Sequence, residues 1–169
     1  IFYYVREVPG KPIYYAAPEV QVLDNVDATD NKLANHLAGS LYDMLPADPK
    51  TVKPAGEWNT IVIKVKDGKV THTQNGKKVV QYTLWSKEWD DMVANSKFKD
   101  FQGFQEGISH EGYIGLQDHG YPIWFRNIKI KELPRKTREA RLFNGEDITN
   151  WDKYGTELWY VKDGLLVCE

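Results

Sequence analysis

The residues best suited to chemistry lie in one block, residues 115–127, with the sequence GLQDHGYPIWFRN. This block combines an acid, an imidazole, two amides, a guanidinium and an indole, which are Asp118, His119, Gln117, Asn127, Arg126 and Trp124. A strand that only separates a core from solvent needs apolar residues alternating with any soluble type. Indole rings stack on sugar rings, while carboxylates, amides and arginine hydrogen-bond to sugar hydroxyls. The block therefore indicates a polar-ligand site, with a sugar as the leading candidate.

Two of the four histidines are candidates for proton transfer. His119 follows Asp118 at the turn after an expected strand, where a carboxylate can orient an imidazole that still faces a ligand. The alternative is a turn residue bonded to the backbone. His72 alternates with Val70 and Gln74, so these three share one face of a strand. On a concave face His72 would point at the substrate, and on the outer face it would be solvated.

The other two histidines carry weaker signals. His36 lies in an aspartate-rich loop and could join Asp24 or Asp30 in a metal site. No tight ligand spacing supports such a site, so a solvated loop residue is the preferred interpretation. His110 precedes a strand and is expected at the surface.

A second polar row precedes the aspartate-rich loop. Glu19 and Gln21 take one face of an expected strand, while Val20 and Val22 take the other. This alternation fits a polar groove above an apolar core. An edge strand exposed to water would show the same alternation.

Aromatic residues add possible stacking surfaces. Trp124 and Arg126 share a face if no bulge intervenes, which would place a cation beside an indole ring. Core packing is the alternative for Trp124. Tyr42 fits either a site or the core.

The candidate residues are expected to lie on strands and the turns between them. Along the chain, short runs of residues that favour strands are separated by dipeptides that favour turns. Asp67-Gly68 and Asn75-Gly76 each join two alternating runs, and Asp163-Gly164 marks a third hairpin. One helix is expected after Ser86 as its N-cap. Further strands are expected at residues 1–6, 20–23, 113–117 and 123–131. Many short strands with turns between them predict an all-β sandwich.

Composition limits the partners and the size of the protein. A length of 169 residues fits one domain. The net charge of −2, with both signs interspersed, gives no electrostatic footprint for nucleic acid or an anionic membrane, so we expect a neutral ligand. The single cysteine, Cys168, excludes an internal disulfide and is expected in the core. No stretch is long and apolar enough to span a bilayer.

The composition changes after residue 133. Residues 1–133 form the main part of the expected sandwich, and residues 134–141, PRKTREAR, have the composition of a linker. A new segment starts at residue 142 and runs to residue 169.

Several blocks resemble the 3-keto-disaccharide hydrolase family. They are EVQVLDN at 19–25, AGSLY at 38–42, KPAGEWNT at 53–60, NG at 75–76 and residues 115–133. The resemblance implies a concanavalin-like jelly-roll β-sandwich, here with one short helix. LFNG at 142–145, Trp151 and WYVKDG at 159–164 look like the opening segment of the family, which in this chain comes last.

The unusual order has a structural consequence. In the family, the opening segment would lead through roughly three strands, about 30 to 40 residues, into the strand that begins here at Ile1. The chain is either cut from a tandem repeat, or is a permuted or truncated version of one domain. A half-sandwich would expose apolar faces and unpaired edges. We therefore expect residues 142–169 to complete the same sandwich or to begin a second copy.

The resemblance also implies a reaction on disaccharides or glycosides that are already oxidised at the third carbon of the sugar. A ketone there makes the hydrogen on the second carbon acidic. Cleavage can then proceed by proton removal, loss of the anomeric substituent from the enolate, and addition of water. This route needs a base near neutral pKa, a group that stabilises the enolate oxygen and an acid for the leaving group. It does not need the paired carboxylates of ordinary glycosidases.

The implied roles follow from these requirements. His119 or His72 would transfer the proton. Asp118 would orient the imidazole, and Arg126 would steady the developing negative charge. Substrate binding would fall to Glu19, Gln21, Tyr42, Gln117, Trp124 and Asn127. A divalent cation held by Glu19, Asp118 or His119 would be another stabiliser of the enolate, and no other cofactor is expected.

Two functions without catalysis compete with this one. A carbohydrate-binding module on the same fold needs aromatic and amide side chains but no base. An oligomerisation domain would present a contact patch formed by Tyr3, Tyr4, Tyr14 and Tyr15. The family resemblance implies a periplasmic or secreted bacterial protein. This chain shows no signal peptide, but that carries no information about location, because residue 1 falls inside a strand-like run instead of at a natural start.

Overall fold

A computed structural model describes residues 1–133, 139–141, 143–149 and 151–169 of the chain. The chain divides into two compact units, Ile1–Leu116 (unit 1) and Gln117–Glu169 (unit 2). Regular structure in both units consists mainly of short antiparallel strands, so the all-β prediction is confirmed. No helix among the described residues has the length and apolar character needed to cross a membrane.

The central feature of unit 1 is a three-stranded meander. Its strands are β2 (Ile61–Lys66), β3 (Lys69–Gln74) and β4 (Lys77–Thr83), paired in the order β2-β3-β4. The two connections are Asp67-Gly68 and Asn75-Gly76, and all four of these residues have positive φ. Two-residue turns with both residues in this conformation match the twist of antiparallel strands. The two hairpins are therefore present where the sequence predicts them.

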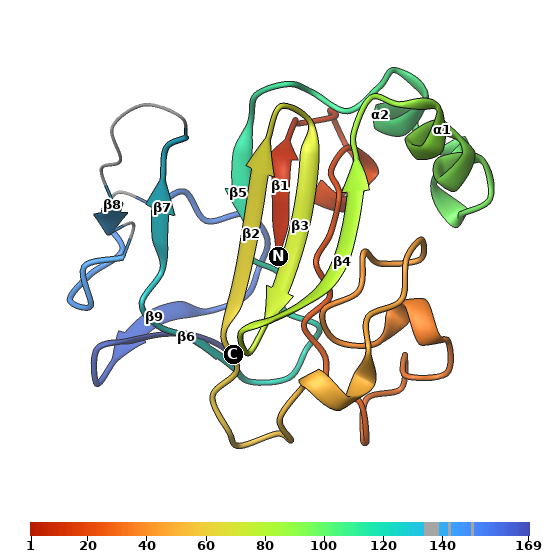
Figure 1. The fold of residues 1–169 in the computed structure, drawn as a ribbon. Helices are drawn as coiled ribbons and strands as arrows, with labels where there is room; N and C mark the ends of the chain where they lie inside the picture. Colours follow the sequence, from red (N-terminus) through yellow and green to blue (C-terminus); the bar gives the residue numbers. More distant parts are fainter. Residues whose placement is uncertain (134–138, 142, 150) are drawn as a thin grey trace. The chain divides into compact units, whose positions relative to one another are not determined.

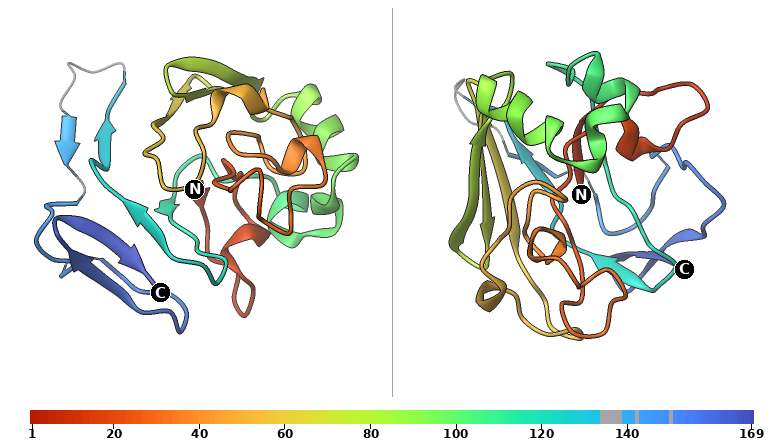
Figure 2. Two further views of the ribbon diagram at one scale, coloured as in Figure 1. Left: turned by 90° about the horizontal axis from the view of Figure 1, so that it is seen from below. Right: turned by 90° about the vertical axis from the view of Figure 1, so that its right-hand side faces the viewer.

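A second layer of unit 1 contains β1 (Phe2–Val5) paired antiparallel with β5 (Tyr113–Gly115). Tyr3 of this layer packs in one core cluster with Val70 and Tyr82 of the meander. The right-hand view of Figure 2 shows the meander on one side of unit 1, with β1 facing it. Unit 1 is therefore a small β-sandwich.

Two expected strands differ in the structure. The strand expected at 20–23 is reduced to isolated bridges, Phe2 to Glu19 and Val20 to Leu41. The strand expected at 123–131 is divided into β6 (Ile123–Phe125) and β7 (Lys129–Lys131). Asn127 between them has a φ of 53°, which does not belong to an extended strand.

Helix α1 (Lys87–Ala94) begins as predicted, because the Ser86 side chain accepts a hydrogen bond from the Trp89 amide. The expectation of one short helix is nevertheless wrong. Unit 1 also contains α2 (Gln102–Gln105) and the 3₁₀ turns η1 (Ile13–Tyr15), η2 (Ala34–His36), η3 (Pro49–Thr51) and η4 (Lys97–Asp100). Such turns are too short to show a helical repeat of apolar residues.

A contact patch was expected as one alternative for four tyrosines, which are Tyr3, Tyr4, Tyr14 and Tyr15. The structure uses them inside unit 1 instead. Tyr3 is buried, and its hydroxyl is hydrogen-bonded to that of Tyr82. The Tyr15 ring stacks on Phe101 with 4.2 Å between the ring centroids. Burial of Tyr3 removes it from any contact patch, and an oligomerisation patch built from the other three tyrosines stays a prediction.

Unit 2 contains a sheet of order β6-β10-β9, with β9 at Trp159–Lys162 and β10 at Leu165–Cys168. A second pair joins β7 to β8 (Glu139–Arg141). Residues 134–138 of the expected linker lie outside the described residues, and 139–141 form β8 instead. The units divide after Leu116, so the expected boundary at residue 133 falls inside unit 2. That residues 142–169 complete the sandwich or begin a second copy stays a prediction.

Gly103 of α2 allows the close contact between this helix and η1. A Cβ at position 103 would lie 2.2 Å from the Cβ of Ala16 and 2.5 Å from the carbonyl oxygen of Tyr15. We expect Gly103→Ala to lower the free energy of unfolding by about 1–3 kcal/mol, because the backbone of Ala16 must move. Urea denaturation followed by circular dichroism measures this loss. The exposed Gln105→Ala in the same helix is the control, with an expected change below about 0.5 kcal/mol. Equal stability of the two variants would contradict the packing.

Candidate active site

Unit 2 contains an open hollow of about 620 Å³, which is the candidate active site. Its lining residues are Gln117, Asp118, His119, Gly120, Tyr121, Pro122, Glu157 and Glu169. The structure thus brings together the three predicted residues Gln117, Asp118 and His119.

Glu157 and Glu169 were missed, although a signal for one of them existed. The turn Asp163-Gly164 pairs Leu165 with Lys162, and each further step along the hairpin pairs the next two residues. Counting outward from the turn pairs Leu158 with Glu169, and the structure joins them by two backbone hydrogen bonds of 3.0 and 3.1 Å. Register alone therefore placed Glu169 at the open end of the hairpin.

Asp118 organises the turn that lines the hollow. Its Oδ1 accepts a hydrogen bond of 2.8 Å from the Gly120 amide. Burial, followed by the nearby Asp118 carboxylate, raises the pKa of the Cys168 thiol to about 12. Cys168 is fully buried, as predicted for a core residue. It therefore stays a thiol at neutral pH and is no candidate nucleophile.

His119 is exposed in the hollow, where a dissolved ligand can reach its ring. Within the described part of unit 2, no hydrogen bond joins Asp118 to His119. The carboxylate shapes the turn instead of orienting the imidazole in this structure.

Strand β6 carries Trp124, which leaves 48% of its surface exposed. The register pairs Trp124 with Val167 and Val167 with Tyr160, so these residues share one face of the sheet. No bulge interrupts β6, and Arg126 and Asn127 after it are exposed. The indole ring of Trp124 is therefore accessible on this face, and the side chains of Arg126 and Asn127 follow it closely along the chain.

Unit 1 holds a second group of predicted residues. Gln21 exchanges backbone hydrogen bonds with the segment at Gly39 and Ser40, at 2.9 and 3.1 Å, and the Tyr42 amide donates to the Glu19 carbonyl at 3.0 Å. Glu19, Gln21 and Tyr42 are therefore held on two adjoining segments. The expected alternation holds only in part. Gln21 is buried, with 8% exposed, and Val22 is exposed because no strand continues past Val20.

His72 lies on neither of the two faces considered from the sequence. It shares one strand face with Val70 and Gln74 as predicted, but that face is buried and His72 has no exposed surface. Its Nδ1 donates to the Gly39 carbonyl oxygen at 3.2 Å, and its Nε2 lies 3.4 Å from the Tyr3 hydroxyl. Burial lowers the pKa of His72 to about 4, so the imidazole is neutral at pH 7. His72 is a core residue in unit 1.

His36 is the largest correction among the histidines, because it is buried and not solvated. Its Nδ1 lies 2.7 Å from Asp30 Oδ1, and its Nε2 lies 2.9 Å from Asp43 Oδ1. Burial by itself lowers the pKa of His36, but the hydrogen bonds with Asp43 and Asp30 outweigh it and the pKa is raised. The Tyr42 hydroxyl donates to Asp30 Oδ2 at 2.7 Å, so that hydroxyl is already used. The sequence suggested Asp30 as a partner of His36 but not Asp43, because contacts between positions six or seven residues apart along a loop follow no periodic pattern.

The predicted residues also bear on a metal site. Among the described residues, no group of three or more histidine, cysteine, aspartate or glutamate side chains is placed to hold a metal ion. The candidates Asp118 and His119 lie in unit 2, and Glu19 lies in unit 1. The described side chains do not form a set of ligands for a cation, so no step of the reaction is assigned to a metal ion.

Comparisons with known proteins find a family model and several relatives that are similar to this chain. A family model described as a 3-keto-alpha-glucoside-1,2-lyase-like domain matches residues 1–131. A 3-keto-disaccharide hydrolase of Bacteroides thetaiotaomicron is 46% identical over an alignment that covers 79% of this chain and 53% of that protein. A crystal structure of a "putative glycosyl hydrolase" from Parabacteroides distasonis is similar with a TM-score of 0.53 and 28% identity, and covers 60% of this chain and 49% of that one. The chain spans about half the length of the curated relative it matches.

The low pKa of His72 predicts a loss of stability in acid. The unfolded chain binds a proton near pH 6.5, while the folded chain resists it until about pH 4. The stabilisation is therefore present above pH 6.5 and is lost as the pH falls toward 4, by about 3 kcal/mol. In the variant His72→Gln this titration is absent. Urea unfolding at pH 7, 5.5 and 4 should show the stability difference from wild type shrinking with acid. A difference that is constant with pH would refute the buried neutral imidazole.

His36 predicts the opposite dependence on pH. A raised pKa means that its contribution is complete below pH 6.5 and is lost as the pH rises through the folded-state pKa. We expect His36→Gln to lower the free energy of unfolding by about 1–3 kcal/mol at pH 6, and by less at pH 9. The control is the exposed His110→Phe, which removes an imidazole but keeps a ring stacked on Trp85, 3.9 Å away between ring centroids, and should change little at either pH. If His36→Gln changed the free energy of unfolding as little as the control does, the hydrogen bonds of Asp30 and Asp43 with a protonated His36 would not stabilise the fold.

Proposed function

Because the chain belongs to the family of 3-keto-alpha-glucoside-1,2-lyase-like domains, we propose that it binds a saccharide oxidised at the third carbon and cleaves its glycosidic bond. The observation that carries the proposal is this family match, which covers residues 1–131. The name of the 46% identical relative supports the substrate class, since that protein is called a 3-keto-disaccharide hydrolase. The hollow of unit 2 supports the chemistry, because it gathers an imidazole, a carboxylate and an amide around open space.

His119 is proposed as the base. Its ring is open to the hollow, whereas His72 has no exposed surface and is neutral in the core. The ketone at the third carbon acidifies the hydrogen on the second carbon. The imidazole of His119 takes this proton, and the electron pair of the broken C–H bond forms the enolate.

The enolate then expels the anomeric substituent. The C–O bond breaks with its electron pair on the leaving oxygen, and that oxygen takes the proton carried by His119. Water adds to the resulting double bond, so the net reaction is hydrolysis. One imidazole serves as base and then as acid, which removes the need for a second titrating carboxylate.

Other predicted residues take binding roles in this proposal. Arg126 steadies the negative charge of the enolate, and Trp124 stacks on a sugar ring. Asp118 holds the turn that carries His119. Gln117 and Asn127 bind hydroxyls. In unit 1, Glu19, Gln21 and Tyr42 keep the substrate-binding roles that the family resemblance implies, although the Tyr42 hydroxyl is bonded to Asp30 and Lys97 Nζ lies 4.1 Å from the centre of its ring.

A binding module without catalysis is the second candidate. It is favoured by the missing hydrogen bond between Asp118 and His119 in the described part of unit 2, since an unoriented imidazole is a poor base. The exposed rings of Trp124 and Tyr121 would serve such a module equally well.

The two candidates are separated by incubating the whole protein with the oxidised and unoxidised forms of one disaccharide, followed by chromatography of the products. We expect cleavage of the 3-keto form only. His119→Ala should lower turnover by about 10²–10⁴, the range of general acid–base catalysis, while the exposed His110→Ala retains it.

Solvent deuterium should also enter the second carbon of the product. Binding of the 3-keto sugar without cleavage would favour the binding module. Full activity of His119→Ala, or cleavage of the unoxidised sugar alone, would reject the mechanism.

A further inference from the structure

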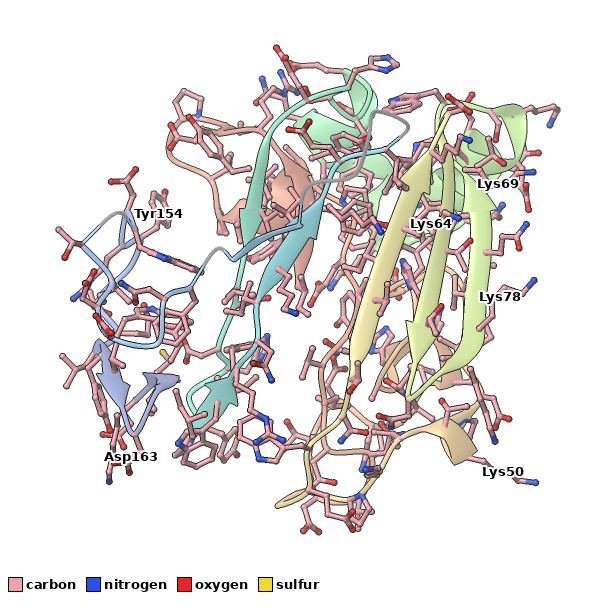
Figure 3. All side chains as sticks on the ribbon, turned by 60° about the vertical axis from the view of Figure 1, so that its left-hand side comes forward. Lys50, Lys64, Lys69, Lys78, Tyr154 and Asp163 are labelled. Carbon is pink, nitrogen blue, oxygen red and sulfur yellow. The ribbon has the colours of Figure 1, made fainter. Side chains whose placement is uncertain are left out.

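The outer face of the meander in unit 1 is strongly cationic. Residues 61–83 contain five lysines and a single acidic residue, Asp67, in a chain whose net charge is −2. Four of these lysines are exposed at outward positions of the three strands, and we call them the lysine face: Lys64, Lys66, Lys69 and Lys78. Figure 3 labels Lys64, Lys69 and Lys78 along this sheet.

The register arranges the lysine face in rows that cross the sheet. The rows are Val62–Thr73–Lys78, Lys64–Thr71–Gln81 and Lys66–Lys69–Thr83. Each row therefore holds at least one ammonium group and at least one threonine hydroxyl. The buried side of the same strands carries Val70, His72 and Tyr82, so the charge is confined to one side.

Among the described residues, no ion pair joins an acidic side chain to any of the four lysines, and their one side-chain hydrogen bond runs from Lys78 Nζ to the Gln81 amide oxygen at 3.1 Å. Lys66 and Lys69 are direct cross-strand partners. Like charges facing each other across two strands destabilise a sheet. This arrangement costs stability unless a partner with negative charge covers it.

The chemistry of the face discriminates among polyanions. Its outward positions contain no aromatic ring on which a base could stack and no arginine to grip phosphate with two hydrogen bonds. Ammonium groups interspersed with hydroxyls and an amide match a polymer that alternates carboxylates with hydroxyls.

We propose that the lysine face binds an anionic polysaccharide of the uronate type. The bound polymer runs across the strands of the sheet, with its carboxylates on the lysines and its hydroxyls on Thr71, Thr73 and Gln81. Anchoring by this face needs no catalytic activity, so its loss and the loss of turnover on 3-keto sugars are separate outcomes.

The test measures binding of the protein to polygalacturonate by affinity electrophoresis at low and high salt. Lys64→Glu/Lys78→Glu should weaken binding at least tenfold, and added salt should weaken binding of the wild type. The matched control is Lys32→Glu/Lys99→Glu, which changes the net charge equally at two exposed positions away from the sheet. It should change binding less than threefold. Circular dichroism checks that both variants are folded.

A stability measurement provides a second readout. Lys69→Glu replaces the like-charged pair with Lys66 by an opposite-charged one, so it should raise the Tm while it weakens polymer binding. A lysine face that only keeps the sheet soluble would show no loss of binding.

Equal weakening by both charge reversals, no binding to polygalacturonate, or tighter binding to anionic lipid vesicles or single-stranded DNA would overturn the proposal.

Discussion

The close approach of residues 38–40 to the buried face of β3 is the contact on which unit 1 depends. His72 Nδ1 donates to the Gly39 carbonyl, and Gln74 Nε2 donates to the carbonyl of Ala38 and to the Thr51 hydroxyl. These bonds satisfy two polar side chains that would otherwise be costly to bury. Gly39 makes the approach possible, because its φ is 87° and a Cβ there would lie 2.9 Å from the Gln74 amide oxygen. The same segment pairs with Gln21, so the EVQVLDN and AGSLY blocks are tied to the meander through one loop.

This contact explains why the histidines of one small protein differ so much in chemistry. His72 donates to a carbonyl in a dry core, so its charged form is disfavoured and its Nε2 is free to accept from Tyr3. His36 is also buried, but two carboxylates compensate its charge and hold the loop that they belong to. His119 alone combines an open hollow with neighbouring polar groups. His72 and His36 are buried and stabilise the fold, whereas His119 is accessible to a ligand.

Unit 2 depends on a different constraint, the two-residue turn at Asp163-Gly164. The turn sets the register of β9 with β10, and β10 in turn pairs with β6 from the family block at 115–133. Strands β9 and β10, from residues 142–169 that resemble the opening segment of the family, therefore form a sheet within unit 2 together with β6 from the block at 115–133. Because the register places Glu169 opposite Leu158, the open end of the hairpin contributes a wall of the hollow. The turn that carries His119 is held by the Asp118 carboxylate, which accepts from the Gly120 amide.

Local signals by themselves determined the all-β class, the three hairpins, the Ser86 cap and the grouping of Gln117, Asp118 and His119. Each of these features is encoded within a few neighbouring residues, by turn conformation, capping or chain continuity. Periodicity also placed His72, Val70 and Gln74 on one face, but it could not tell which side that face would meet. Only the tertiary structure decided this, because burial of His72 depends on Gly39, 33 positions earlier in the chain. The pairing of His36 with Asp43 was hidden for the same reason, since a loop without a repeat brings partners together only after the layers beneath it have packed.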